Sequence, residues 1–162
     1  MSNYFQGTAS KPYHISVGAI LFNQEGKVAC HHFKDHPHLN GEAYILMRET
    51  LEEGESLEEA LKRGLKEEFG ENGELITYVG SLVKPYQISD VTVQKTTLYF
   101  AVKLITINEN ERMPDDPEAG STIEWLTTDD LIRKTKHCAS ELNLPDIDES
   151  EILKIAVSLG II

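Results

Sequence analysis

Residues 56–69 of this sequence carry both the start and the stop signals of an amphipathic helix. Ser56 stands three residues before Glu59, a capping-box spacing that satisfies free backbone donors in a first helical turn. Apolar residues then recur every four positions and form one stripe, which consists of Leu57, Leu61, Leu65 and Phe69. Gly70 follows where a left-handed residue commonly ends a helix. An apolar stripe must be covered, so this helix has to pack against another layer of the fold.

The other apolar runs are mostly short and rich in β-prone residues. They predict strands at residues 15–22, 27–33, 43–47, 75–83, 91–107 and 122–126. Further helices are expected from about residue 129 and over residues 149–159. Strands and helices mix without the regular alternation of a doubly wound sheet. We therefore expect an α+β fold or an α/β/α sandwich.

The length of 162 residues predicts a single domain. Residues 1–10 are polar and small, and residues 4–7, Tyr-Phe-Gln-Gly, resemble the remnant of a purification-protease site. We expect residues 1–10 to be a tag or a disordered arm, and residues 11–162 to form the domain.

The charge balance excludes several classes of partner. Lys and Arg number 15 and Asp and Glu number 27, a net charge of −12. This disfavours nucleic acid and anionic membranes, both of which need a basic surface. No run approaches the roughly 20 apolar residues of a membrane span. Cys30 and Cys138 form no disulfide framework, so the simplest expectation is a reduced, cytoplasmic protein.

Acidic residues concentrate on and around the predicted helix, where residues 49–74 hold ten of the 27 acids. Arg63 and Glu67 are four residues apart and share a helix face, where the guanidinium can pair with a carboxylate. Glu68 is adjacent, and Glu55 precedes the helix on a loop. Mg²⁺ favours oxygen ligands from one or two carboxylates plus substrate phosphates. From these residues alone, a metal site and a solvated acidic helix stay equally open.

The spacing of these acids resembles the Nudix box: Gly, five residues, Glu, seven residues, then Arg-Glu-aliphatic-any-Glu-Glu-any-Gly-aliphatic. The matching positions, without a gap, are Glu55, Arg63, Leu65, Glu67, Glu68 and Gly70. Three positions depart from it: Glu49 replaces the opening Gly, Gly64 replaces the Glu after Arg, and Glu71 replaces the closing aliphatic residue. The resemblance spans roughly residues 13–131 and implies a mixed β-sheet flanked by helices.

The resemblance also implies a function and a set of site residues. Glu67 and Glu68 would bind Mg²⁺ or Mn²⁺, Arg63 would hold a carboxylate in place, and Glu55 would be its partner. The implied reaction is hydrolysis of the diphosphate linkage in a small molecule of the type nucleoside diphosphate linked to another group. The alternative is a nucleotide-binding or regulatory module with weak or no turnover, which the three departures favour.

Gly64 leaves a question that the sequence does not answer. In a regular helix this position faces the same site as Glu67 and Glu68, yet glycine has no side chain. Either a metal ligand has been lost, or a carboxylate from elsewhere replaces it. Glu49 is one such carboxylate, but nothing in the sequence fixes the direction of its side chain.

Several further groups of residues could either take part in catalysis or binding, or simply lie on the surface. Asp115, Asp116 and Glu118 are candidates for the general base or an acidic surface turn. Arg48, Lys84 and Lys95 would neutralise substrate phosphates or face solvent. The histidines of the following cluster would bind a metal, line the pocket or simply be exposed: His31, His32, His36 and His38. The long strand predicted over residues 91–107 offers an edge for a homodimer.

Overall fold

The computed structural model describes residues 3–162 and contains one seven-stranded sheet. Its strands are β1 (Tyr13–Phe22), β2 (Val28–Phe33), β3 (Ala43–Ile45), β4 (Met47–Thr50), β5 (Glu71–Ile88), β6 (Val91–Ile107) and β7 (Thr122–Leu126). Its helices are α1 (Leu57–Gly64), α2 (Thr128–Leu142) and α3 (Ser150–Ser158), and the short helical turns are η1 (Leu65–Phe69), η2 (Glu109–Glu111) and η3 (Pro145–Ile147).

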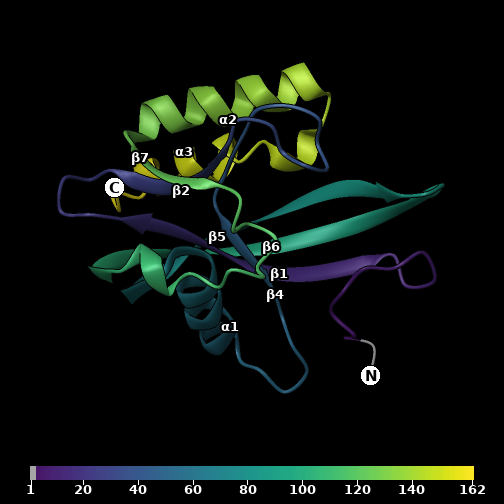
Figure 1. Cartoon of the computed structure of the whole chain (residues 1–162), viewed down its shortest axis with the longest axis horizontal. Coiled ribbons are helices and arrows are strands. Elements are labelled where there is room, and N and C mark those ends of the chain that lie inside the picture. The colour runs from purple at the N-terminus through teal and green to yellow at the C-terminus, as the bar shows by residue number, and fades with distance from the viewer. Residues whose placement is uncertain (1–2) are drawn as a thin grey trace.

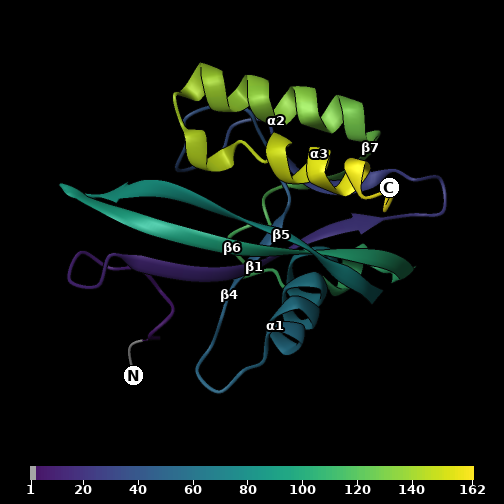
Figure 2. The same cartoon turned by 180° about the vertical axis from the view of Figure 1, so that it is seen from behind.

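The sheet is mixed and lies between two helical layers. Its main path runs β3-β2-β1-β6-β5, with β1 and β6 parallel, while β4 pairs with β1 and β7 pairs with β2. Helix α1 covers one face, and α2 and α3 cover the other (Figure 1). Figure 2 shows the same three layers from behind. The expected mixed sheet flanked by helices is therefore confirmed.

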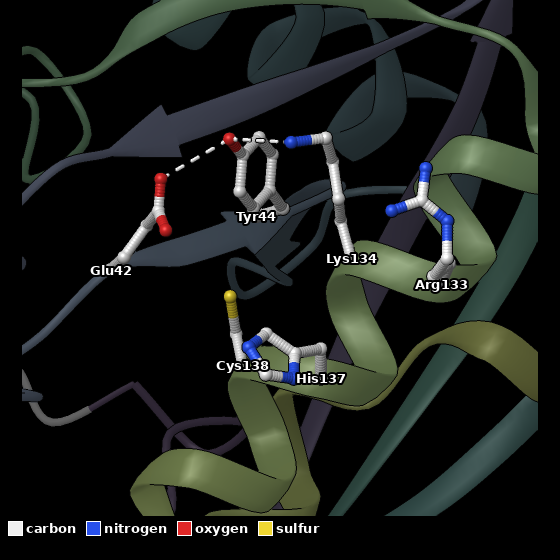
Figure 3. Close-up of a pocket in the computed structure, with 6 residues that line it drawn as sticks. All are labelled: Glu42, Tyr44, Arg133, Lys134, His137 and Cys138. Carbon is white, nitrogen blue, oxygen red and sulfur yellow. Dashed lines mark hydrogen bonds between the residues drawn. The ribbon is translucent and has the colours of Figure 1, made fainter.

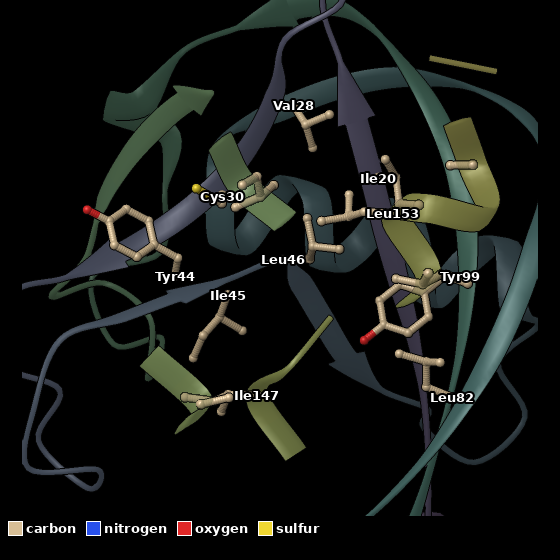
Figure 4. Close-up of a cluster of buried hydrophobic side chains, with 14 of the residues drawn as sticks. Ile20, Val28, Cys30, Tyr44, Ile45, Leu46, Leu82, Tyr99, Ile147 and Leu153 are labelled. Atoms are coloured by element: carbon tan, nitrogen blue, oxygen red, sulfur yellow. The ribbon is translucent and has the colours of Figure 1, made fainter. Parts of the chain in front are cut away.

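Each face of the sheet has its own apolar core. Toward α2 and α3 the buried side chains include Ile20, Leu46, Tyr99, Ile147 and Leu153 (Figure 4). Toward α1 they include Val17, Met47, Leu61, Leu65 and Phe69. The predicted stripe of the first helix is thus largely buried, and only Leu57, at 37% exposed, lies at its margin.

The helix predicted over residues 56–69 is present but changes type partway. Ser56 Oγ accepts from the Glu59 amide at 3.2 Å, and Glu59 Oε2 accepts from the Ser56 amide at 2.8 Å, so the capping box forms. Gly70 ends the helix at φ 66°. Between them, η1 is π-helical. Each hydrogen bond of a π turn encloses one more residue than an α turn, which rotates the side chains that follow.

Two strand boundaries differ from the sequence expectation. The run expected at residues 43–47 divides into β3 and β4 because the chain changes partner there: β3 pairs with β2 and β4 pairs with β1. The strand expected at residues 75–83 extends to residues 71–88. Pro85 lies within β5 at the edge of the sheet, where a missing backbone donor is tolerated.

Strand β4 presents alternate side chains to the two helical layers. Met47 packs in the α1 core, and Glu49 lies against Gly64 of α1. Arg48 Nη1 donates to the Asp146 carbonyl at 3.0 Å, on the α3 side. This alternation is the ordinary period of a strand, and it separates the acidic and basic residues of the sequence Met-Arg-Glu-Thr.

The N-terminal segment, expected to be a tag or a disordered arm, makes contacts with the rest of the chain where it is described. Asn3 Nδ2 donates to the Leu51 carbonyl at 2.6 Å, and Phe5 packs against the α1 core. The Ile15 amide donates to the Phe5 carbonyl at 3.0 Å. Residues 3–5 therefore contact the domain; residues 1 and 2 lie outside the described residues. Across residues 3–162, no helix combines the length and the apolar character needed to cross a membrane.

Candidate active site

Three carboxylates from distant parts of the sequence converge beside the C-terminal end of α1. Glu49 comes from β4, Glu67 from η1 and Asp116 from the loop after η2, and each offers an oxygen within 4.8 Å of the others. All three are partly buried. Within residues 3–162 this is the one group of three or more Asp, Glu, His or Cys side chains close enough to share a metal ion. We call it the carboxylate cluster.

Arg63 ties this cluster to the loop before the helix. Its Nε and Nη2 each donate to one oxygen of Glu55 at 2.9 Å, and its Nη1 lies 3.1 Å from Glu49 Oε1. Nη1 is also 3.6 Å from Glu67 Oε2. The bidentate contact with Arg63 lowers the pKa of Glu55. One guanidinium thereby orients Glu55 fully and holds two members of the cluster from one side.

Gly64 is explained by the close approach of β4. A Cβ added to Gly64 would lie 2.7 Å from Glu49 Cβ and 2.8 Å from Met47 Sδ, closer than real Cβ contacts. The space that a side chain at position 64 would need is therefore filled by Glu49. The helix lacks a carboxylate here, and the neighbouring strand brings one to the same place.

The electrostatics of the cluster suit a hard divalent cation. Burial raises the pKa of Glu49, and the nearby Glu67 and Asp116 raise it further, while Arg63 opposes them. Carboxylates held this close repel one another, and a cation between them would relieve that repulsion. Oxygen donors alone are what Mg²⁺ and Mn²⁺ prefer. The residues present thus fit a bound Mg²⁺ or Mn²⁺.

Glu68 lies outside the carboxylate cluster. It is 2% exposed, and its Oε2 is 2.7 Å from His31 Nε2. His31 Nδ1 in turn is 2.8 Å from Ser121 Oγ. Burial lowers the pKa of His31 to about 3, so its ring is neutral at pH 7, and burial raises the pKa of Glu68 well above its usual range. The π turn thus directs Glu67 to the cluster and Glu68 to a buried polar network.

Arg112 secures the loop that carries Asp116. Its Nε donates to the Glu68 carbonyl at 2.6 Å, its Nη1 to the Ser121 carbonyl at 3.0 Å and its Nη2 to the Glu118 carbonyl at 2.8 Å. These bonds join η1 to both ends of the loop. Sequence reasoning missed Arg112 because no local pattern distinguishes it from a surface arginine.

The three candidates for a general base occupy different environments. Asp116 belongs to the carboxylate cluster, and Asp115 is exposed. The Glu118 amide donates to Asp116 Oδ1 at 2.8 Å. Burial and the neighbouring Asp116 raise the pKa of Glu118 to about 7. A carboxyl near neutrality beside a cluster of this kind can exchange a proton with a reacting group.

A comparison with known protein families identifies the family to which this chain belongs. The family model described as NUDIX domain matches residues 12–144, most of the chain. The chain belongs to the Nudix family. Nudix proteins generally use divalent metals, bind small nucleotide-like substrates and hydrolyse nucleoside diphosphate derivatives.

Solved Nudix structures share the fold at low sequence identity. A NUDIX hydrolase from Nitrosomonas europaea matches with a TM-score of 0.59 and 16% identity, over 80% of this chain and 87% of that one. The MutT protein from Methanosarcina mazei Go1 matches with a TM-score of 0.55 and 15% identity, over 82% and 94% of the two chains.

The ORF135 protein of E. coli also shares the fold, with a TM-score of 0.57 and 17% identity over 96% of each chain. No curated protein matches the sequence. At 15–17% identity these solved structures establish the Nudix fold. The substrate of this chain has to be inferred from the residues of its own site.

The remaining histidines of this Nudix chain lie apart from the carboxylate cluster. The His32 ring stacks on Tyr44 at 4.3 Å, and its Nε2 is 2.8 Å from Glu42 Oε1. Glu42 and Tyr44 line a pocket of about 330 Å³ with Lys134, which donates to the Tyr44 hydroxyl at 3.0 Å (Figure 3). His32 therefore belongs to a polar cluster against α2. Within residues 3–162, no histidine takes part in a group suited to a metal ion.

We expect His31→Leu to destabilise the fold, because it leaves the buried Glu68 carboxyl group without its side-chain partner, while Ser121 Oγ keeps only its bond from Arg112 Nη2. Each unsatisfied group costs about 1–3 kcal/mol of unfolding free energy. Urea unfolding followed by circular dichroism measures this loss, with His38→Leu, at an exposed loop position, as the control. Equal urea midpoints for His31→Leu and wild type would contradict the role of this network.

Proposed function

We propose that this chain is a Mg²⁺- or Mn²⁺-dependent hydrolase that cleaves the diphosphate linkage of a nucleoside diphosphate joined to another group. The observation that supports the proposal is that the Glu49 side chain occupies the space beside Gly64, where the Nudix box has a glutamate on the helix. The carboxylate absent from α1 is replaced from β4, so the carboxylate cluster keeps three acids. A site that had merely lost a ligand would have no such replacement.

The proposed ligands differ from the pair that the sequence implied. Glu67 remains a proposed metal ligand, and Glu49 and Asp116 join it because the three carboxylates converge. Glu68 acts as a positioning residue in this proposal, since its contact with His31 anchors η1. Glu55 and Arg63 keep their proposed roles, with Arg63 holding Glu55 and Glu49.

The reaction adds one water molecule across the diphosphate. A bond forms between the water oxygen and phosphorus, the bridging phosphorus–oxygen bond breaks, and the water proton passes to a base. A bound divalent cation would supply Lewis-acid polarisation of the phosphoryl oxygens. Glu118 is the proposed base because it is partly buried beside Asp116, on the loop that Arg112 fixes. Arg63 keeps the carboxylates oriented while charge develops on the leaving phosphate.

The test is hydrolysis of a panel of nucleotide sugars, dinucleotides and nucleoside triphosphates, with Mg²⁺, with Mn²⁺ and with a chelator. We expect the wild type to release phosphate-containing products with either metal and none with the chelator. Glu67→Gln is expected to lose this activity, while Glu58→Gln, on the exposed side of α1, retains it. Ligand-induced thermal stabilisation without any product would instead assign the chain to the binding or regulatory class.

We also propose a class of partner, a cellular location and an oligomeric state for the protein. Its acidic surface favours small-molecule substrates over nucleic acid, and we propose a cytoplasmic protein with one domain over residues 11–162. The strand expected over residues 91–107 to offer a dimer edge is β6, and this expectation was wrong because β6 lies between β1 and β5. Strand β5 forms the edge instead, and we propose that edge for a homodimer. Sedimentation velocity would show a monomer if this last proposal is wrong.

A further inference from the structure

A pocket of about 610 Å³ lies on the α3 side of the sheet, away from α1. Its walls come from β1, from the β5–β6 ribbon and from the segment that joins α2 to η3. The volume falls within the range of small-molecule sites, about 300–1,000 Å³. Two further pockets are smaller, at about 330 and 320 Å³. We call this space the ribbon pocket.

The ribbon pocket contains a cation without a partner. Lys95 of β6 lines it, and within residues 3–162 its ammonium makes neither a hydrogen bond nor an ion pair. Burial and the nearby Arg48 lower the pKa of Lys95 to about 8. A partly enclosed ammonium that no carboxylate contacts is unfavourable, and an anion bound directly beside it would reduce that cost.

The other charged groups around Lys95 are already committed or too far away. Arg48 donates to the Asp146 carbonyl at 3.0 Å and lies 3.8 Å from Glu149. The Glu149 carboxylate accepts from the Leu46 amide at 2.7 Å and from the Tyr99 hydroxyl. Asp146 also lines the pocket, and Glu118 lies near enough to raise the pKa of Lys95, yet neither carboxylate forms an ion pair with it. Lys95 is thus the cation left for a ligand.

His14 gives the pocket a fixed, neutral wall. Its Nδ1 is 3.0 Å from the Tyr86 hydroxyl and its Nε2 is 3.0 Å from Thr50 Oγ1. Burial lowers the pKa of His14 to about 4, so the ring carries no charge at pH 7. The Tyr86 ring and the side chains of Leu39 and Leu144 supply apolar surface. The pocket therefore combines an apolar wall with one positive point charge.

Strand β4 connects the ribbon pocket to the carboxylate cluster. Glu49 belongs to the cluster, while the flanking Arg48 and Thr50 contact residues that line the pocket. Consecutive residues of a strand are only about 3.3 Å apart along its axis. Arg48 and Glu49 face opposite sides of the sheet, but Glu118, on the loop that carries Asp116, lies near enough to Lys95 to raise its pKa. A diphosphate held at the cluster would therefore direct its substituent past this loop toward the pocket.

We propose that the ribbon pocket binds the part of the substrate beyond the diphosphate, and that this part carries a phosphate or carboxylate group that pairs with Lys95. This inference rests on the proposed function, because it assigns the second half of the same substrate. The reaction itself is unchanged. Lys95 would act as a specificity-determining residue that selects the leaving group by its charge.

The test compares matched substrates that differ in one anionic group. A uridine diphosphate hexose and its hexuronate differ by a carboxylate, and a dinucleotide and its 2′-phosphorylated form differ by a phosphate. The readout is the ratio of kcat/KM for the anionic member to that for the neutral member. We expect wild type to favour one or both anionic members, and Lys95→Met to reduce that ratio about 10- to 100-fold. The pair that responds identifies the group.

Two further variants keep the result interpretable. Lys95→Arg retains the charge and should preserve the ratio, whereas Lys103→Met removes an exposed lysine of the same strand and should leave it unchanged. Equal ratios in wild type and Lys95→Met would overturn the inference while the hydrolase stands. If the panel shows no turnover, calorimetric binding of the same four compounds replaces it. Loss of anion preference in Lys95→Met would then support the pocket although the proposed function had failed.

Discussion

Glu49→Gln is expected to reduce metal-dependent hydrolysis by about 10²–10³-fold, because a divalent cation contributes several kcal/mol of transition-state stabilisation. Glu49 supplies the carboxylate that α1 lacks, and it lies 3.1 Å from Arg63 Nη1. The amide keeps the size of the side chain but not its charge. Steady-state kinetics over a Mg²⁺ and Mn²⁺ titration measures the effect. Activity within a few-fold of wild type would remove Glu49 from the proposed ligands.

A double variant, Glu49→Gly with Gly64→Glu, tests whether a carboxylate on the helix can replace the one on the strand. Gly64→Glu alone should be inactive or poorly folded, because its Cβ would lie 2.7 Å from Glu49 Cβ. Combined with Glu49→Gly, it moves the carboxylate from the strand to the helix and frees the space it needs. We expect the double variant to be more active than either single variant. Two independent, additive losses would contradict the exchange.

Glu71→Leu is expected to stabilise the protein. Glu71 is 2% exposed, and neither of its carboxylate oxygens finds a hydrogen-bond partner within residues 3–162. Removing an unsatisfied buried polar group should raise the unfolding free energy by about 1–3 kcal/mol. Each kcal/mol corresponds to roughly 2–4 °C in Tm for a chain of this size. Differential scanning calorimetry at pH 8 measures the change.

The pH dependence gives this prediction a second readout. Burial raises the pKa of Glu71 to about 8. Between the ordinary carboxyl pKa and pH 8, the unfolded chain ionises Glu71 while the folded chain keeps it protonated. Wild-type stability from this group is therefore greatest at low pH and falls as pH rises toward 8. Glu71→Gln should flatten that slope, and an unchanged slope would show that Glu71 does not titrate in this way.

The sequence predicted the elements whose signals are local. The capping box at Ser56, the apolar stripe and the stop at Gly70 identified the first helix, and the box spacing identified the family. The Arg63–Glu55 contact also followed from the box. Each of these depends on residues close in sequence, or on a motif that implies the contact.

The parts that the sequence did not predict depend on tertiary contacts. The direction of Glu49 follows from how β4 pairs with β1, which no local pattern reveals. The different environments of Glu67 and Glu68 follow from a π turn where a regular α-helix was expected. His31 contacts Glu68 across 37 residues of sequence. Their side chains were recognisable as candidates, but their partners were not.

Strand β4 also indicates where this protein tolerates insertions and deletions. Four residues divide their side chains between the acidic cluster and the basic side of the sheet. A single-residue deletion in β4 would exchange the two faces and turn Arg48 toward the acids, since a one-residue slip inverts a strand. Changing the length of the loop over residues 34–42 would leave that polarity intact. Deletion scanning should therefore find tolerance in the loop before Ala43 and complete loss of activity within β4.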